Sequence, residues 1–316
     1  MTQKTDPKID SRIGPDFMRG IAMRAPGVAA TRGFYEKSWG LRTVAEGNDG
    51  TFYLRGTGSE YWIYALREDR DFGIDYINFG MNSRARVDAL HAQLSNEGIS
   101  TTAPAELSTP GGGYGFSTLD PEGRRLRFSA DVARHTDTDD ERALPRKVSH
   151  VVLNTPAMDA TSAWYQQHLN FRVTDYSADM MVFLRCATDE AFSDHHCLAL
   201  NRAQYASANH VAFEMPSIDS FMRGIGRMKG AGQAPSWGPG RHGPGNNPFA
   251  YFVSPSGFVI EFTSEVHKVE EATHAPEVWP RDVPEKMDTW MTAGPPTPAM
   301  RTVMAGRPDA GWQSAG

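Results

Sequence analysis

The sequence predicts an α+β fold in which one layout of strands and helices occurs twice. Two observations support this prediction. The first is a repeat: residues 150–173 match an earlier segment at a shift of 130 positions, and later segments match at a shift of 134. The second is that 316 residues are enough for two domains of ordinary size. The matched pairs are Pro156 with Pro26, Tyr165 with Tyr35, Arg172 with Arg42, Phe213 with Phe79, Pro255 with Pro121 and Gly257 with Gly123.

The elements of the second copy follow from hydrophobic periodicity and turn residues. A helix is expected with Asp159 as its N-cap, and another from residue 219 to 229, closed by Gly230 and Gly232. A Gly/Pro-rich loop is expected at 238–245. The expected strands cover residues 148–154, 180–186, 196–201, 209–215, 249–253 and 258–263.

The first copy repeats this order of elements. We therefore expect an N-terminal domain at residues 1–134, a linker at 135–145 that holds an acidic run, and a C-terminal domain at 146–265. The expected strands and helices of the first copy cover residues 14–23, 28–38, 51–65, 75–81, 84–95 and 114–128.

Residues 266–316 have no counterpart in the first copy, and we call them the C-terminal extension. They contain Trp279, Trp290 and Trp312, side chains that are rarely left in solvent. We therefore expect the extension to wrap the body of the protein or to cover an opening.

Composition excludes several classes of function. The net charge is −6 and the 32 Lys and Arg residues are scattered, so nucleic acid is not an expected partner. No apolar stretch reaches the ~20 residues of a membrane span, and the polar N-terminus lacks the apolar core of a secretory signal. Cys186 and Cys197 are the only cysteines. We interpret them as reduced thiols of a cytoplasmic protein, a compartment that also favours ferrous iron.

The two copies differ in side chains that can bind a metal. Two histidines and one carboxylate on a common face form the ligand set of non-haem Fe(II) oxygenases, which leaves adjacent positions open for substrate and O₂. Their occurrence in one copy predicts a single metal site. The second copy has His150, His210 and Glu261 at three matched positions, where the first has Gly20, Tyr76 and Arg127.

Each ligand also has a plainer interpretation. A lone strand His is more often a packed or surface residue than a ligand. Glu261 interrupts the apolar run 258–262, where a carboxylate is costly unless it is paired or coordinated, and its alternative is a buried ion pair.

Three further residues could supply acid–base groups. His196 is expected to open the strand 196–201, which would turn its side chain to the face of Leu198 if the strand is regular. His242 lies in the glycine-rich loop, and Tyr251 lies in the strand expected to pair with that of Glu261. His195 competes with His196, His242 could be a solvent-exposed loop residue, and Tyr251 could be a core aromatic.

Several stretches of the second half carry a family resemblance through their order and spacing. They are 149–153 (SHVVL), 194–200 (DHHCLAL), 209–214 (NHVAFE), and Gly240-Arg241-His242 followed nine residues later by Tyr251 and then by 255–261 (PSGFVIE). Together they resemble the catalytic domain of the type I extradiol ring-cleaving dioxygenases, in the vicinal oxygen chelate superfamily. The resemblance covers residues 12–265, most strongly 147–264. It implies that each domain is a pair of βαβββ modules forming a curved, barrel-like mixed sheet, with no metal in the N-terminal domain.

The resemblance also implies a function: O₂-dependent meta-cleavage of an aromatic ring by an oxidoreductase that incorporates both oxygen atoms. By this resemblance His150, His210 and Glu261 bind Fe(II), or Mn(II) in a minority of members. His196 would stabilise reduced dioxygen and supply a proton, and His242 and Tyr251 would hydrogen-bond substrate oxygens. Family members commonly assemble, so we expect a homo-oligomer.

One departure and two rivals accompany this hypothesis. Related sequences often have an acidic residue shortly after the loop His, whereas 243–247 (GPGNN) has none, and Asn246 or Asn247 could replace it. The rivals are a glyoxalase-like isomerase or epimerase, which needs a further carboxylate and no O₂, and a metal-free binding protein of the bleomycin-resistance kind. The candidate substrates are a substituted catechol, a biphenyl-type diol or a trihydroxylated aromatic. Residues that could line their pocket, or could be plain core, are Met180, Met181, Phe183, Phe192, His195, Asn246 and Asn247.

Overall fold

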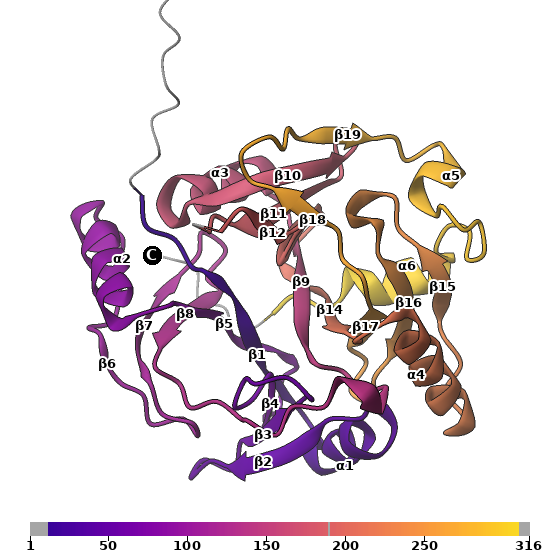
Figure 1. Ribbon diagram of the computed structural model, residues 1–316, viewed down its shortest axis with the longest axis horizontal. Helices are drawn as coiled ribbons and strands as arrows, with labels where there is room; N and C mark the ends of the chain where they lie inside the picture. The colour runs from indigo at the N-terminus through magenta and orange to yellow at the C-terminus, as the bar shows by residue number, and fades with distance from the viewer. Residues whose placement is uncertain (1–11, 189, 310–316) are drawn as a thin grey trace, which may run out of the picture.

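Two curved mixed sheets lie side by side and form the body of the protein (Figure 1). The computed structural model describes residues 12–188 and 190–309. Residues 1–11, 189 and 310–316, which include Trp312, lie outside the described residues. The fold is α+β, as predicted, and the described chain forms four successive βαβββ modules.

The first sheet has eight strands in the order β2-β3-β4-β1-β5-β8-β7-β6. Its two helices are α1 (Val28–Phe34), which continues as a π-helical turn (Tyr35–Trp39), and α2 (Arg84–Asn96). The strands are β1 (Phe17–Ala25), β2 (Arg42–Glu46), β3 (Phe52–Arg55), β4 (Tyr64–Glu68), β5 (Gly73–Gly80), β6 (Ala105–Glu106), β7 (Tyr114–Leu119) and β8 (Arg125–Ala130).

The second sheet has nine strands in the order β15-β16-β17-β14-β9-β13-β11-β10-β19. Its helices are α3 (Met158–Leu169) and α4 (Ile218–Gly230), and a separate two-stranded sheet pairs β12 (Phe192–Asp194) with β18 (Lys268–Glu270). The strands are β9 (Lys147–Thr155), β10 (Phe171–Ser177), β11 (Met181–Cys186), β13 (Leu198–Arg202), β14 (Ser207–Glu214), β15 (Trp237–Arg241), β16 (Pro248–Val253), β17 (Val259–Thr263) and β19 (Glu277–Trp279).

Strand register confirms the internal repeat. Asn78 on β5 lies opposite Arg127 on β8, and the equivalent pair is Ala212 on β14 opposite Glu261 on β17. Each of these residues differs from its counterpart by the shift of 134 positions seen in the sequence. The same side-chain positions therefore face the same side of each sheet, and the two copies differ in what those positions hold.

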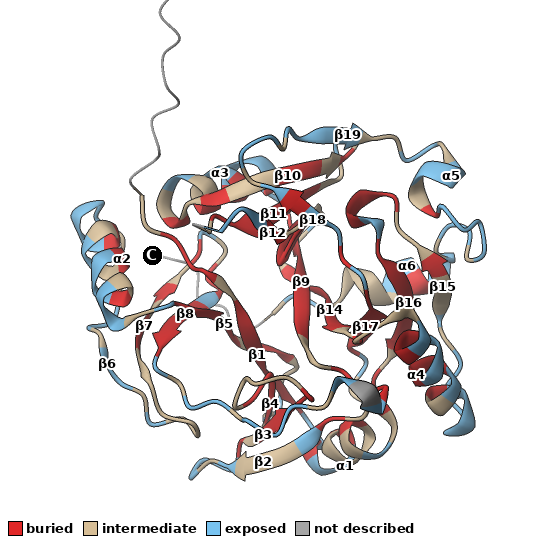
Figure 2. Ribbon diagram, viewed as in Figure 1, coloured by how far each residue is buried: buried red, intermediate tan, exposed pale blue. Residues whose placement is uncertain are grey.

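One continuous hydrophobic core joins the two halves. Trp39, in the first half, is fully buried and stacks on Phe262 of β17, with ring centroids 3.7 Å apart. In return, Tyr165 on α3 donates a hydrogen bond of 2.9 Å to Asp120 of the first half. Figure 2 shows β9, β14 and β17 buried along their length, while α2 and α4 expose one side. The first helix of each half thus packs against the other half, which anchors the strands of the second sheet from behind.

The C-terminal extension wraps the second sheet and returns to the first half. It pairs β18 with β12, adds β19 to the edge of the second sheet, and then forms α5 (Pro284–Met287) and α6 (Pro298–Ala305). Beyond α6, Asp309 pairs with Arg24 of β1. Trp279 is partly buried, but Trp290 is 38% exposed, so the expectation that all three tryptophans avoid solvent was wrong for Trp290.

Several local predictions needed correction. Helix α3 begins at Met158 with Ala157 as its N-cap, so Asp159 lies in the first turn and does not cap the helix. The segment predicted as a Gly/Pro-rich loop at 238–245 is strand β15 up to Arg241, because its pairing with β16 satisfies the backbone despite the glycines. Short 3₁₀ helices cover Asp140–Arg142, in the predicted linker, and Pro244–Asn246.

Candidate metal centre

Four candidate residues lie in or beside one row that crosses neighbouring strands. His150 on β9 lies opposite Ala212 on β14, Ala212 opposite Glu261 on β17, and Glu261 opposite Tyr251 on β16. His210 lies two residues before Ala212 on β14. Directly paired residues share one face of a sheet, so the strands themselves bring these side chains together.

The three predicted metal ligands converge. One donor atom from each of His150, His210 and Glu261 lies within 4.8 Å of the others. Nε2 of His150 is 3.3 Å from Oε2 of Glu261, and Nε2 of His210 is 3.2 Å from it. Two ligand atoms each about 2.1 Å from one ion, at a right angle, are about 3.0 Å apart. The two His–Glu distances are close to that value, as expected for side chains that bind one divalent ion.

The atom of His210 that faces Glu261 carries an unshared electron pair and no proton. Nδ1 of His210 lies 2.8 Å from Oδ1 of Asn209, whose own Nδ2 donates to Oδ1 of Asn154. Asn209 therefore presents its oxygen, and His210 must carry its proton on Nδ1. Nδ1 of His150 likewise lies 3.3 Å from the hydroxyl of Ser149. Nε2 of His210 then aims an unshared electron pair at the Glu261 carboxylate, and a cation between the two groups removes the repulsion.

The hydrogen-bond inventory agrees with this fit. Among the described residues, neither carboxylate oxygen of Glu261 nor Nε2 of His210 has a hydrogen-bond partner, although all three atoms are buried. Burial lowers the pKa of His210, which keeps the imidazole neutral and able to coordinate. The ion-pair alternative for Glu261 lacks any Lys or Arg partner in the described chain.

The matched positions of the first half cannot bind a metal. Gly20 occupies the position of His150, and a Cβ there would lie 2.6 Å from the carbonyl oxygen of Ile63. At the other two positions the guanidinium of Arg127 lies over the ring of Tyr76, 3.9 Å from its centroid. A cation–π pair fills the space that the ligands occupy in the second half.

His196 lies beside the metal ligands, and His195 lies behind it. The ring of His196 is 4.3 Å from that of His150 and 5.1 Å from that of Phe183. The regular alternation expected from residue 196 was wrong, because strand β13 begins only at Leu198 and both Cys197 and Leu198 face the core. The break turns His196 to the opposite face. Burial and the neighbouring His150 lower the pKa of His196 well below its usual value.

His195 completes a chain of buried polar groups that sequence reasoning missed. Its Nδ1 lies 2.9 Å from Nδ1 of His196, and its Nε2 lies 2.9 Å from Oδ2 of Asp175 on β10. Trp279, in the C-terminal extension, donates from Nε1 to the same oxygen at 2.7 Å. The sequence gives no signal for Asp175, because its strand β10 (FRVTDYS) mixes polar and apolar residues.

His242 and Tyr251 form a hydrogen-bonded pair on the other side of Glu261. Nε2 of His242 is 3.1 Å from the Tyr251 hydroxyl, and the His242 ring stacks on Phe249 with centroids 3.9 Å apart. Burial, together with the charge of Glu261, raises the pKa of Tyr251 well above its usual value, so the hydroxyl stays protonated. Asp288, from the C-terminal extension, pairs in a β-bridge with His242 and supplies the negative charge that 243–247 lack.

Some of the remaining pocket candidates lie beside the metal ligands and others do not. Met181 and Phe183 cluster with Val152 and Ala199 next to His196, so the structure brings them to the site. Other candidates lie elsewhere for identifiable reasons. Phe192 is 54% exposed because its strand β12 pairs at the surface with β18, and Met180 lies in the turn before β11. Asn246 is exposed and accepts a hydrogen bond from Arg241, while Asn247 is buried and donates to Thr263.

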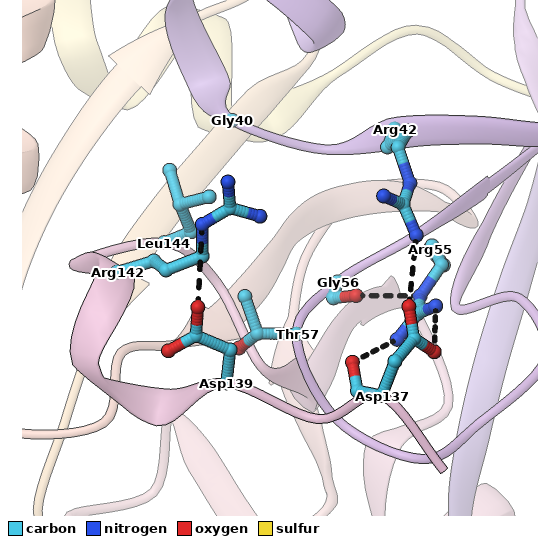
Figure 3. Close-up of a pocket in the computed structure, with 9 residues that line it drawn as sticks. All are labelled: Gly40, Arg42, Arg55, Gly56, Thr57, Asp137, Asp139, Arg142 and Leu144. Atoms are coloured by element: carbon cyan, nitrogen blue, oxygen red, sulfur yellow. Dashed lines mark hydrogen bonds and ion pairs between the residues drawn. The ribbon is translucent and has the colours of Figure 1, made fainter. Parts of the chain in front are cut away.

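A small cavity of about 60 Å³ lies away from this centre, where the predicted linker meets the first half (Figure 3). Arginines line it, but each is paired: Arg55 with Asp137 at 2.8 Å, Arg42 with the same carboxylate, and Arg142 with Asp139. These internal ion pairs hold the linker against the first half and leave no charge directed at a ligand.

Two other predictions can be checked here. Cys186 and Cys197 are free thiols with their sulfurs 3.4 Å apart, as predicted. In the described part of the chain, no helix has the length and apolarity that a membrane span requires.

Comparison with known proteins places this site in a family. The Glyoxalase/Bleomycin resistance protein/Dioxygenase superfamily model matches residues 147–262. A curated relative, metapyrocatechase 2 from Cupriavidus necator, is 31% identical over 158 residues, which is 50% of this chain and 47% of the relative. The chain thus matches about half the length of that relative.

Solved structures extend the likeness to nearly the whole chain. The Mn(II)-bound glyoxalase from Novosphingobium aromaticivorans superposes with a TM-score of 0.86 at 36% identity, covering 96% of this chain and 99% of that one. A variant of homoprotocatechuate 2,3-dioxygenase from B. fuscum has the same fold, with a TM-score of 0.80 at 20% identity, covering 94% and 84%. The divalent-metal site, the paired modules and these matches together show that the chain belongs to the Glyoxalase/Bleomycin resistance protein/Dioxygenase superfamily.

Proposed function

We propose that this protein is an extradiol dioxygenase that uses Fe(II) and O₂ to cleave an aromatic diol or triol next to its hydroxyl groups. The observation that carries the proposal is the ligand set. Two imidazoles and one carboxylate converge, and the described residues offer no fourth His, Cys, Asp or Glu donor to the same cluster. Three protein ligands leave adjacent positions for a chelating diol and for O₂. The likeness to metapyrocatechase 2, at 31% identity over 158 residues, supports it.

The surrounding residues suit the proton transfers of such a reaction. Fe(II), when bound, would polarise the diol oxygens and provide an electronic path to O₂. On one side of the ligands, Tyr251 and His242 offer a protonated hydroxyl and an imidazole to hydrogen-bond the substrate oxygens. On the other, His196 lies beside His150, where it can exchange a proton with the reacting oxygens. All are neutral donors or acceptors in a buried site that limits stray water.

A second candidate is a metal-dependent isomerase of the glyoxalase kind, because the 36%-identical solved structure is named a glyoxalase. Such a reaction needs an additional carboxylate as ligand or base and no O₂. Glu261 is the one carboxylate in the cluster formed by the described residues, and the groups around it are imidazoles and a phenol. That composition favours oxygen chemistry over isomerisation.

The test is anaerobic loading with Fe(II), followed by a panel of catechols and trihydroxybenzenes in an oxygen electrode. We expect one O₂ consumed per diol, a yellow ring-opened product, and two ¹⁸O atoms in the product when ¹⁸O₂ is used. Isomerisation of a hemithioacetal without O₂ uptake would instead establish the second candidate.

Matched variants assign the roles. His210→Ala should lose both iron and turnover, whereas His196→Phe should retain iron and lose most turnover. His91→Phe, on α2 of the first half, is the control and should change neither. Full activity in both site variants would mean that these residues do not have the proposed roles.

A further inference from the structure

A line of hydrogen bonds runs from the C-terminal extension to His196. Trp279 Nε1 donates to Oδ2 of Asp175 at 2.7 Å, and the backbone N–H of Glu277 donates to Oδ1 at 2.9 Å. His195 bridges the same carboxylate to His196 through its two ring nitrogens, at 2.9 Å on each side. Asp175, His195 and His196 are all at least 96% buried. A satisfied polar chain at this depth fixes its members in one arrangement.

The chemistry of the carboxylate sets the direction of every proton in the chain. Burial raises the pKa of Asp175, but its hydrogen bonds from His195, Glu277 and Trp279 outweigh burial and hold it below its usual value. An ionised carboxylate only accepts, so His195 carries a proton on Nε2. Burial lowers the pKa of His195 despite the neighbouring charge, which keeps its Nδ1 unprotonated. His196 must then donate from Nδ1.

From this arrangement we infer that Asp175 and His195 are positioning residues that hold His196 in the Nδ1–H form, with its Nε2 as a hydrogen-bond acceptor for groups at the metal centre. The tautomer assignment does not depend on the proposed function, whereas the expected effect on turnover rests on it. A carboxylate that orients an imidazole through one ring nitrogen and so selects its tautomer is a recurring arrangement in acid–base catalysis. Here the carboxylate acts through a second imidazole.

The C-terminal extension is part of this device. β19 pairs in parallel with β10, placing Glu277 opposite Asp175, and Trp279 reaches back to the same side chain. His274 adds a further contact, because its Nε2 lies 2.9 Å from the carbonyl of Thr174. The C-terminal extension thus orients Asp175, and Asp175 in turn orients His195.

The decisive test is the tautomeric state of the histidines in the full-length protein. Chain labelled with ¹⁵N-histidine is loaded with diamagnetic Zn(II) in place of iron, and long-range ¹H–¹⁵N correlation spectra report which ring nitrogen carries the proton. We expect the Nε2–H form for His195 and the Nδ1–H form for His196. An Nε2–H form of His196, or a doubly protonated His195, would overturn the inference.

Asp175→Asn tests the source of the tautomers. Its Oδ2 position receives two N–H donors and its Oδ1 position a third, so an amide NH₂ faces a donor in either orientation. We expect the His195 and His196 signals to move away from the wild-type tautomers, while Val278→Ala, an exposed neighbour on β19, leaves them unchanged. Unchanged tautomers in Asp175→Asn would contradict the inference.

Should Asp175→Asn fail to fold, His195→Gln and His195→Leu provide the same information. The Gln amide can donate to Asp175 and accept from His196, whereas Leu can do neither. We expect His195→Leu to lower kcat on the order of 10–100-fold with little change in KM, and His195→Gln to recover most of the loss. Equal losses in the two variants would indicate a packing role. Absence of turnover in the wild type would refute the proposed function and leave the tautomer measurement intact.

Discussion

Nε2 of His210 lies 3.2 Å from Oε2 of Glu261, yet neither atom has a hydrogen-bond partner among the described residues. Asn209 accepts the other ring proton of His210, so the two facing atoms are both electron-pair donors. An arrangement of this kind is unfavourable in the metal-free protein and favourable around a cation. We therefore expect substitutions of Glu261 and of Asn209 to have different effects on stability and on metal binding.

Glu261→Gln should stabilise the metal-free protein and remove the stabilisation that metal gives the wild type. In a chelator, the Gln amide can donate to one of the facing imidazoles, so the variant should be more stable than the wild type by roughly 1–3 kcal/mol. With Fe(II) or Mn(II) added, the wild type should gain stability and the variant should not. Thermal unfolding with and without metal measures both effects, and a variant that is less stable in chelator as well would contradict the cation-site account.

Asn209 should control metal affinity without touching the metal. Its side chain fixes the His210 tautomer, and its own orientation is fixed by Asn154, which also binds carbonyls of α6. We expect Asn209→Leu to weaken metal binding about 10–100-fold. Asn201→Ala is the control, because Asn201 donates to Asn154 without contacting His210. Calorimetric metal titration distinguishes them, and equal affinities would remove Asn209 from the site.

Trp39 should be the main anchor between the halves. It is fully buried and packs edge-on against Phe213 and Phe252 as well as stacking on Phe262. Trp39→Ala is expected to lower the free energy of unfolding by about 3–5 kcal/mol, whereas the exposed Lys37→Ala should change it by less than about 0.5 kcal/mol. Chemical denaturation measures both. A small loss in Trp39→Ala would show that the halves do not depend on this contact.

Acid should weaken the attachment of the C-terminal extension to the second sheet, because Glu271 becomes protonated. This buried carboxylate accepts from Arg172 at 2.6 Å and from Arg185 at 2.9 Å. Burial raises the pKa of Glu271, but the hydrogen bonds from Arg185, Ser193 and Arg172 outweigh it and leave the pKa below its usual value. A carboxyl of this kind stabilises the fold above its unfolded pKa of about 4.3 and loses that contribution as pH falls through the folded pKa.

The free energy of unfolding should therefore fall between about pH 5 and about pH 3. Glu271→Gln should be less stable at pH 7, by roughly 3–5 kcal/mol, and should show a shallower decline with acid. Glu270→Gln, at an exposed neighbouring position, should follow the wild type. Denaturation at several pH values checks this, and an equally steep decline in Glu271→Gln would assign the acid sensitivity to other groups.

Much of the architecture and the metal ligands could be predicted because each left a strong mark on the sequence. The repeat fixed the equivalence of positions, and Glu261 stood out as a charge inside an apolar run. Its burial without any Lys or Arg partner is what a ligand requires. The asymmetry between the copies has a physical form as well, since Arg127 packs on Tyr76 where the second half has Glu261 and His210.

The residues that orient the site, Asn209 and Asp175, could not be predicted, because irregularities in their strands decide which way their side chains face. Register shifts occur between Val173 and Asp175 on β10 and between Ala208 and His210 on β14. A single extra residue turns the following side chains to the other face of a sheet. The late start of β13 had the same effect on His196. Alternation read from the sequence assumes regular strands and fails at these points.

Metal content per chain is the measurement that tests the central claim most directly. The protein is loaded anaerobically with Fe(II), freed of excess metal by gel filtration, and compared with His150→Ala, His210→Ala and Glu261→Gln. The account predicts one ion per chain in the wild type and none retained in any of the three variants. Stoichiometric iron in all three, or none in the wild type, would contradict a single centre built from His150, His210 and Glu261.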